Sequence, residues 1–414
     1  MKHSFFLAPI SILLALLFFA GCGDDAEEDT GGGGRTSDGG RTGDGGRTGN
    51  NGGPDVDGKT GIIYCDEEVE VSTFAGGSEI IKDTGCYPVD ETGTAAGFCS
   101  PAGLAIDAAN NLYVADGWYI RKITPQGNVS TLAGTSEGHN EDSFIGTDGK
   151  TYSGNLYNAM YITVNAKTGN LYATTGGHNT RIREVTQAGW ISTFVGGGES
   201  KRELGFADEQ GKNALFRGPN GMTMDAAGNL YVVDGGNHRI RKVTEGGMVS
   251  TFAGSGEEGY ADGPGNVAKL GGTGITIDAD GNLYVADYYN DSIRKITPNG
   301  AVSTLAGSRE RETGYVDGRG EEARFEFPED ITIDKAGNLY VTANERIRKV
   351  SPQGVVCTLA GSESSREYPV KNVVNGPGNI AQFYGPLGIV VDSAGNLYVA
   401  ESRSGRIRKI EFKK

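Results

Sequence analysis

The residues with the clearest capacity for chemistry are two adjacent acids, Glu329 and Asp330, in the segment "PED". They stand where three other copies of a repeated passage read Pro-x-Gly, at Pro101, Pro219 and Pro386. Carboxylate and amide oxygens are the ligands that Ca²⁺ prefers. Glu329 and Asp330, with Asn220 of the "PNG" copy, are therefore candidates to hold a divalent cation such as calcium. The alternative is a solvated loop, which we favour because charged residues are mostly exposed.

Other groups that could support catalysis are few. The chain of 414 residues has only four histidines. No GxSxG nucleophile elbow accompanies a Ser-His-Asp arrangement of a serine hydrolase. We therefore assign no catalytic residue, and we favour a non-enzymatic protein over an enzyme.

The cysteines indicate an exported protein. Cys22 stands apart near the N-terminus, and the other four suit a protein with disulfides. Cys86 and Cys99 lie in one spacer between repeats, so we expect them to pair, which leaves Cys65 and Cys357 to pair by elimination. Three connectivities remain open on sequence alone. No CxxC spacing predicts metal binding by cysteine.

A repeat must position these residues. Six copies of the triplet "NLY" follow one another at spacings of 53 to 59 residues, at Asn111, Asn170, Asn229, Asn282, Asn338 and Asn396. Around each triplet, segments such as "GMTMD", "NLYVVD" and "RIRKV" predict three short strands joined by turns of the "DAAGN" and "TEGG" type, and "VSTFAG" predicts a fourth. The Asp that precedes each first turn is expected to bond its backbone N–H groups. Four antiparallel strands per repeat, without helical periodicity, predict the blades of a propeller.

The first and last repeats are incomplete. Residues 70 to 76, "EVSTFAG", have no repeat in front of them, and the last repeat ends at Lys414 without a fourth strand. A propeller avoids an open seam when the N-terminal segment supplies the missing strand. We therefore predict an all-β, six-bladed β-propeller of four-stranded blades, in which residues 69 to 76 complete the blade begun by residues 386 to 412.

The N-terminal part is of another kind. Residues 1–21 begin with Lys2 and run apolar from Phe5 to Ala20, the layout of a signal peptide. The "FAGC" that ends at Cys22 resembles a bacterial lipoprotein signal, in which Cys22 is lipidated. Residues 22–60 are rich in glycine and predict a flexible tether. Residues 61–414 form the propeller. We expect an exported, cell-envelope lipoprotein held on the outer membrane or cell surface.

The repeats resemble a known family. "GNLYVVDGGNHRIRKV" looks like the NHL repeat, and spacers such as "GYADGPGNVAKL" are similar to those of teneurin-type NHL domains. The resemblance implies a six-bladed ring that hosts either binding modules or metal-dependent enzymes. Six-bladed relatives that act as lyases or lactonases hold a divalent metal near the channel mouth with His, Asp, Glu or Asn. This adds His178 and His238 to the metal-ligand candidates.

Charge limits the partners. The formal net charge is −15, which speaks against nucleic acid and leaves a lipid anchor as the expected contact with a membrane. The arginines of the "RIRK" segments are interpreted as strand residues whose heads pair with acids such as Asp116 or Asp234. We expect a monomer.

The long spacers and the loops between second and third strands are predicted to share one face. Variable loops on a rigid frame carry function, and aromatic residues are favoured at interfaces. The candidates for binding on this face are Trp118, Tyr119, Tyr288 and Tyr289; half of them could instead cap blade edges.

Two hypotheses follow. The favoured one is a surface-tethered, non-enzymatic scaffold that binds an extracellular or periplasmic protein or glycan through its long-loop face. The alternative is a metal-dependent hydrolase or lyase with a site at the channel mouth.

Overall fold

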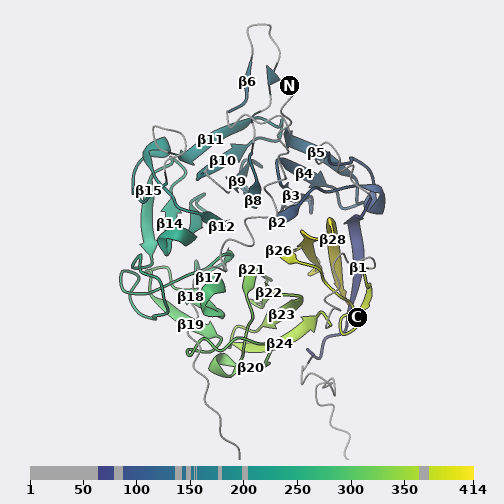
Figure 1. Ribbon diagram of the computed structural model, residues 1–414, viewed down its shortest axis with the longest axis vertical. Coiled ribbons are helices and arrows are strands. Elements are labelled where there is room, and N and C mark those ends of the chain that lie inside the picture. Colours follow the sequence, from purple (N-terminus) through teal and green to yellow (C-terminus); the bar gives the residue numbers. More distant parts are fainter. Residues whose placement is uncertain are drawn as a thin grey trace, which may run out of the picture. The chain divides into compact units, whose positions relative to one another are not determined.

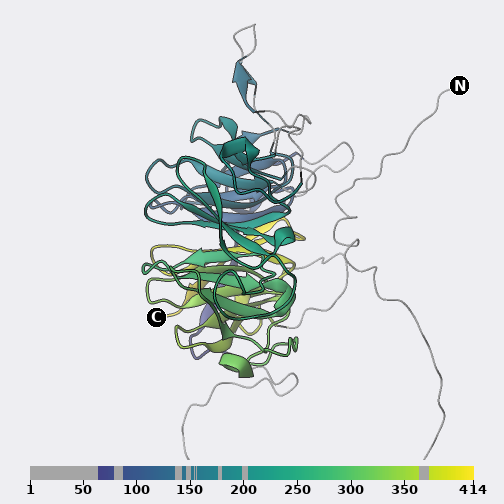
Figure 2. The same ribbon diagram turned by 90° about the vertical axis from the view of Figure 1, so that its left-hand side faces the viewer.

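The computed structural model describes residues 64–78, 87–135, 142–145, 151–152, 154, 156–175, 180–197, 204–362 and 373–414. Within these residues the chain forms six sheets, each with four long antiparallel strands, arranged around a central axis (Figures 1 and 2). The innermost strands of neighbouring sheets pack side by side, and the first packs against the last. The predicted six-bladed β-propeller is confirmed. None of the described residues belongs to a helix long and apolar enough to cross a membrane.

The blades have the following bounds. Blade 1 contains β2 (Pro101–Ile106), β3 (Leu112–Asp116), β4 (Tyr119–Ile123) and β5 (Val129–Gly134). Blade 2 contains β8 (Ala159–Val164), β9 (Leu171–Thr175), β10 (Arg181–Val185) and β11 (Ile191–Gly196). Blade 3 contains β12 (Pro219–Met224), β13 (Leu230–Asp234), β14 (Arg239–Val243) and β15 (Val249–Ala253). Blade 4 contains β16 (Ile275–Ile277), β17 (Leu283–Asp287), β18 (Ser292–Ile296) and β19 (Val302–Ala306).

The last two blades carry an extra short strand on the outside. Blade 5 contains β21 (Pro328–Ile333), β22 (Leu339–Ala343), β23 (Arg346–Val350), β24 (Val355–Ala360) and the short β20 (Gly318–Arg319). Blade 6 contains β26 (Pro386–Val391), β27 (Leu397–Glu401), β28 (Arg406–Phe412), β1 (Val69–Gly76) and the short β25 (Gly376–Pro377). A separate hairpin pairs β6 (Phe144–Ile145) with β7 (Thr151–Tyr152). Single 3₁₀ turns are η2 (Gly93–Ala95), η3 (Gly211–Asn213), η4 (Gly235–Asn237), η5 (Tyr288–Asn290) and η6 (Gly320–Glu322).

The turn between the first and second strands is held by its aspartate, as expected. In blade 3, Asp225 Oδ1 accepts a bond from the Asn229 backbone N–H at 2.8 Å, and Asp225 Oδ2 accepts one from Asn229 Nδ2 at 2.8 Å. The Tyr231 hydroxyl donates to the same carboxylate at 3.5 Å. The same arrangement recurs at Asp107, Asp278, Asp334 and Asp392. Because these turns are short, they fix the register in which the first and second strands pair.

The N-terminal strand closes the ring. β1 pairs antiparallel with β28, with Val71 opposite Ile410 and Ser72 opposite Lys409. β1 is therefore the outermost long strand of blade 6, and the predicted closure is confirmed. Just before β1, Tyr64 pairs with Thr358 on the outer strand of blade 5.

A disulfide joins the same two parts of the chain. Cys65 and Cys357 are bonded with a sulfur–sulfur distance of 2.04 Å, across 292 residues of sequence. This is the pairing expected by elimination. Cys99 is also in a disulfide, whereas Cys86 lies outside the described residues.

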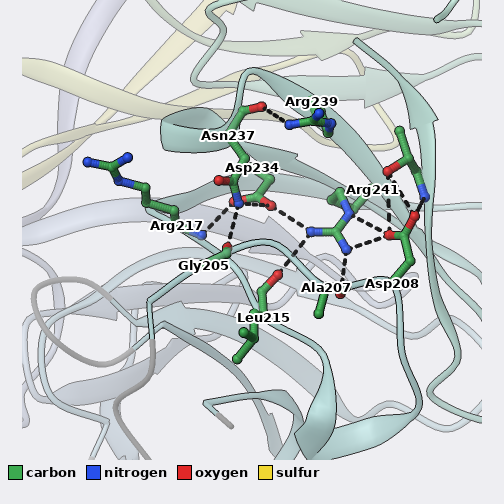
Figure 3. A network of polar contacts seen from close by, with 10 residues as sticks. Gly205, Ala207, Asp208, Leu215, Arg217, Asp234, Asn237, Arg239 and Arg241 are labelled. Atoms are coloured by element: carbon green, nitrogen blue, oxygen red, sulfur yellow. Dashed lines mark hydrogen bonds and ion pairs between the residues drawn. The ribbon is translucent and has the colours of Figure 1, made fainter. Parts of the chain in front are cut away.

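Each blade contains one fully buried arginine at the centre of its third strand: Arg121, Arg183, Arg241, Arg294, Arg348 and Arg408. In blade 3, Arg241 Nη1 donates to Asp234 Oδ2 at 2.7 Å and to the Leu215 carbonyl at 3.0 Å (Figure 3). Its Nη2 donates to Asp208 Oδ1 at 2.6 Å and to the Ala207 carbonyl at 2.8 Å. The arginine thus joins the end of the second strand to the spacer. The predicted pairing with Asp116 and Asp234 is confirmed.

The apolar core is divided into six clusters, each shared by two neighbouring blades. Between blades 3 and 4, for example, Tyr231 and Ile240 pack with Ile275 and Leu283. Another cluster joins β1 residue Val69 of blade 6 to Ile347 of blade 5. Because each cluster is built from the side chains of two neighbouring blades, loss of one blade exposes apolar surface on the blades on either side of it.

Deletion of residues 65–76 is expected to destabilise the whole ring, because it removes β1 and one half of the Cys65–Cys357 disulfide. Deletion of residues 23–58 should leave thermal unfolding nearly unchanged. The two truncations are compared by circular dichroism melting. Equal melting temperatures would contradict the closure argument.

Substitution Arg241→Met should cost about 3–5 kcal/mol of unfolding free energy, because Asp234 is left buried without its partner. The control is Lys242→Met, the next residue on β14, whose ammonium lies 5.4 Å from the Tyr231 ring; its loss should cost about 1 kcal/mol or less. Urea unfolding measures both. Similar losses for the two variants would show that the buried arginine has no special role.

Candidate ligand site at the channel mouth

The innermost strands approach one another most closely at one level of the ring, which we call the axial position. It is glycine in four blades: Gly103, Gly221, Gly274 and Gly388. A Cβ atom on Gly103 would lie 2.6 Å from the Met160 carbonyl oxygen, and one on Gly388 would lie 2.3 Å from that of Ala102. These glycines are required because the next blade's backbone occupies the space of a side chain.

Blades 2 and 5 depart from this pattern, with Tyr161 and Asp330 at the axial position. In a ring of six these two blades lie opposite each other across the channel (Figure 1). Both also have a threonine on the second strand. Tyr161 N–H donates to Thr174 Oγ1 at 3.2 Å, and Asp330 N–H donates to Thr342 Oγ1 at 3.0 Å. The two blades therefore place polar side chains where the others have none.

Asp330 is only 9% exposed, and Glu329 before it is partly buried. The Ile389 N–H of blade 6 donates to Asp330 Oδ2 at 3.1 Å. Burial raises the pKa of Asp330 to about 7, although N–H groups of Ile389 and Ile331 oppose the shift. Burial also raises the pKa of Glu329 to about 7, with a further contribution from the charge of Asp330 and opposition from Arg403. Near neutral pH, the two carboxyls are thus poised between their charged and neutral forms.

Two hydroxyl groups face these acids. Thr273 Oγ1 donates to the Glu329 carbonyl at 2.6 Å and is a hydrogen-bond partner of the Tyr161 phenol. The pKa of Tyr161 lies well above its usual range, first because of burial and then because of the negative charges of Glu329 and Asp330. The phenol of blade 2 therefore reaches across the channel towards blades 4 and 5 and stays neutral.

Three aromatic rings stand beside Glu329. Tyr288 stacks on Phe327 with ring centroids 5.2 Å apart and an interplanar angle of 27°, and Tyr289 meets Tyr288 edge-on at 5.1 Å. Burial and then the charge of Glu329 raise the pKa of Tyr288 to about 12 and that of Tyr289 above its usual value. Phe327 adopts a left-handed backbone with φ of 48°, where blades 3 and 6 have the glycines Gly218 and Gly385. A bulky residue in this conformation is strained.

A cavity of about 220 Å³ lies within the channel, between the innermost strands. Tyr161 and Asp330 line it, together with four threonines one level below the axial position: Thr163, Thr223, Thr276 and Thr332. The channel is therefore polar along much of its wall.

The structure distributes the predicted metal ligands unevenly. Glu329 and Asp330 lie together, but Asn220 has its Nδ2 against Gly235 in its own blade. His238 ends the turn η4 in a left-handed conformation, and His178 lies outside the described residues. Among the described residues, no three His, Cys, Asp or Glu side chains come close enough together to hold a metal ion.

The predicted aromatic residues also differ in position. Trp118 and Tyr289 are 41% and 44% exposed, and Tyr288 is partly buried beside Glu329. Tyr119 is buried, because it begins β4 and lies opposite Gly134 and Asp116. Its side chain belongs to the frame of blade 1. Cys22 lies outside the described residues.

Sequence reasoning missed Tyr161, Phe327 and Thr273. A signal for Tyr161 was present, since "AMYITV" breaks the glycine rule of the axial position as "PEDITI" does. Phe327 stands in the place of a glycine that precedes proline in two other blades. Thr273 had no such signal.

Comparison with known proteins agrees with this architecture. The model of the NHL repeat matches residues 216–243 and 383–410. Teneurin-3 of Danio rerio is 30% identical over 344 residues, which cover 75% of this chain and 12% of that protein. The chain carries NHL repeats.

Solved structures share the fold. An auxiliary nutrient binding protein from Bacteroides thetaiotaomicron has a TM-score of 0.60 at 19% identity, with 86% of this chain and 79% of that one covered. A gluconolactonase from Xanthomonas campestris has a TM-score of 0.50 at 12% identity, with 82% and 98% covered. At such low identities the likeness shows the fold alone. The NHL propeller spans only about an eighth of the teneurin chain that it resembles.

The double substitution Glu329→Gln/Asp330→Asn is expected to stabilise the protein at pH 8 and to have little effect at pH 5. A carboxyl whose pKa is raised on folding binds more protons in the folded state, so its cost to stability appears as the pH rises from about 4 to 7 and persists above 7. At pH 8 the free energy of unfolding should rise by on the order of 1–3 kcal/mol, which should raise the melting temperature by a few degrees. Asp280→Asn, in an exposed turn, is the control. A gain at pH 5 equal to that at pH 8 would contradict the assignment.

Proposed function

We propose that this protein is a surface-tethered, non-enzymatic scaffold that binds an extracellular protein or glycan through the long-loop face of its propeller. The observation that carries the proposal is the placement of aromatic side chains. Among the described residues, the exposed aromatic side chains in the loops of this face include Trp118, Tyr157, Tyr289 and Phe327.

These loops lie at the same end of the blades. Pro101, at the start of β2, pairs with Asp116 at the end of β3, and Pro219 pairs with Asp234 in the same way. The loop after each second strand therefore lies beside the spacer that enters the first strand. Trp118 and Tyr289 lie in loops that follow second strands, whereas Tyr157 and Phe327 lie in spacers that enter first strands. The aromatic residues thus surround the channel mouth that holds Glu329 and Asp330.

Exposed aromatic residues on a rigid frame are suited to recognition. Their rings supply contact area at low entropic cost and stack on sugars or on partner side chains. One protein of similar fold is described as an auxiliary nutrient binding protein, which supports a binding role for this fold. The competing role, a metal-dependent hydrolase or lyase, has less support, because no three His, Cys, Asp or Glu side chains among the described residues could hold a metal ion together.

We also propose that the protein is exported and that Cys22 carries the lipid that holds it to the cell envelope. The support is the apolar run that ends in "FAGC", the glycine-rich residues 22–60 and the Cys65–Cys357 disulfide. Disulfides persist in oxidising compartments.

Substitution of Trp118 and Tyr289 by Ala should weaken binding of the partner without lowering the melting temperature, because both side chains are exposed. Anchors of this kind contribute about 2 kcal/mol or more each. Binding is measured on arrays of glycans and of extracellular protein domains, with the wild-type protein as reference. Tyr119→Ala is the control, and this buried substitution should lower the melting temperature. Unchanged array binding by the double variant would refute the proposed face.

A further inference from the structure

The channel mouth holds a buried carboxyl without a positive partner. Five acidic residues are classed as buried among the described residues: Asp116, Asp234, Asp287, Glu401 and Asp330. The first four each contact the buried arginine of their own blade, at 2.7 to 3.3 Å. Within the part of the chain that the structure describes, neither Asp330 nor its neighbour Glu329 is in an ion pair. A buried charge is ordinarily compensated, so this pair lacks a cation that the other sites have.

Among the described residues, Arg403 is the cation that acts on Glu329, but it does not fill this role. Arg403 acts on the charge of Glu329 from a distance, but its side chain is exposed and its guanidinium lies over the Tyr384 ring at 5.8 Å. Asp330 is instead open to the cavity, which it lines, and Glu329 lies within electrostatic range of Asp330 and Tyr288. A positive group bound between the aromatic rings and the cavity would lie near both carboxyls.

The walls beside the acids define the rest of such a ligand. Tyr288 and Phe327 stack side by side, and Tyr289 stands edge-on to Tyr288. Aromatic faces attract organic cations through the ring quadrupole and bury the apolar groups attached to them. A hydrated metal ion gains little from such walls, since Ca²⁺ takes six to eight oxygen ligands. The Tyr161 phenol, on a residue that lines the cavity, adds a hydrogen-bonding group near the acids.

We propose that the channel mouth binds an organic ammonium ion, with Glu329 and Asp330 as its counter-charge and with Tyr288, Tyr289 and Phe327 as its aromatic wall. This inference rests on the proposed binding function and names the chemistry that the ligand presents. The ammonium group enters from the long-loop face and displaces water from the two carboxyls. The aromatic wall contacts the carbon atoms next to nitrogen.

The test compares ligand pairs that differ in charge. Choline is compared with its uncharged carbon isostere 3,3-dimethyl-1-butanol, and glucosamine with glucose, by isothermal titration calorimetry on the full-length protein at pH 8. At least one charged member should bind, and its uncharged partner should bind at least about tenfold more weakly. Choline and glucosamine also distinguish a quaternary from a primary ammonium group.

Substitutions assign the binding to this mouth. Glu329→Gln should weaken the bound amine by at least about tenfold, and Tyr288→Leu should weaken it by several-fold. The matched controls are Glu321→Gln, an exposed acid on η6, and Tyr87→Leu, a tyrosine that is 50% exposed. Both controls should bind the amine as the wild type does. Melting curves at pH 8 confirm that each variant is folded.

Three results would overturn the inference. Binding of Ca²⁺ in place of either amine would make the acids a metal site. Equal binding of glucose and glucosamine would make the mouth a neutral sugar platform, and loss of amine binding in the controls alone would place the site elsewhere. Failure of the ammonium inference can be distinguished from failure of the proposed function. Partner binding on the arrays depends on Trp118 and Tyr289, and it persists if only the ammonium inference fails.

Discussion

The buried arginine at the centre of each third strand is the interaction on which the rest of the structure depends. In blade 3 it joins three segments: β14, the end of β13 and the spacer around Asp208, which lies 33 residues before the arginine. The spacer contains much of the long-loop face, so the arginine fixes that face to the blade. A buried ion pair adds little net stability compared with an apolar core, but its hydrogen bonds are satisfied in one arrangement. The arginines therefore specify how the loops sit.

The arginine contacts differ in the two blades that depart from the pattern. Blades 2 and 5 have Thr175 and Ala343 where the other second strands end in an acid. Burial lowers the pKa of Arg183 to about 10, although Asp142 opposes this, and it also lowers that of Arg348. In blade 4 burial acts in the same direction, but Asp287 and Asp262 outweigh it and raise the pKa of Arg294. The same blades 2 and 5 carry Tyr161 and Asp330, so the repeat is least regular where the candidate site is built.

Much of the frame could be predicted from the sequence, because local chemistry determines it. Motifs that recur in the repeats predict the aspartate turns and the alternation of the strands. The closing strand is predicted because residues 70–76 have no repeat in front of them. The site could be predicted only in part. Glu329 and Asp330 were found because they break a repeated motif, but nothing local shows that Tyr161 reaches across the ring towards them. Tyr119 was expected on the binding face as a loop aromatic, whereas its place at the start of β4 buries it. Distances across the channel depend on how six blades pack, which no single repeat encodes.

The Cys65–Cys357 disulfide also determines how the ring responds to a pulling force. β1 belongs to blade 6, whereas the residues just before it are bonded to β24 of blade 5. Tension applied from the N-terminal side of Cys65 is transmitted through a covalent bond to β24 before it reaches the hydrogen bonds between β1 and β28. A strand pulled from one end would otherwise separate from its neighbour one hydrogen bond at a time. The disulfide instead distributes the load over two blades, so the seam of the ring is protected from peeling.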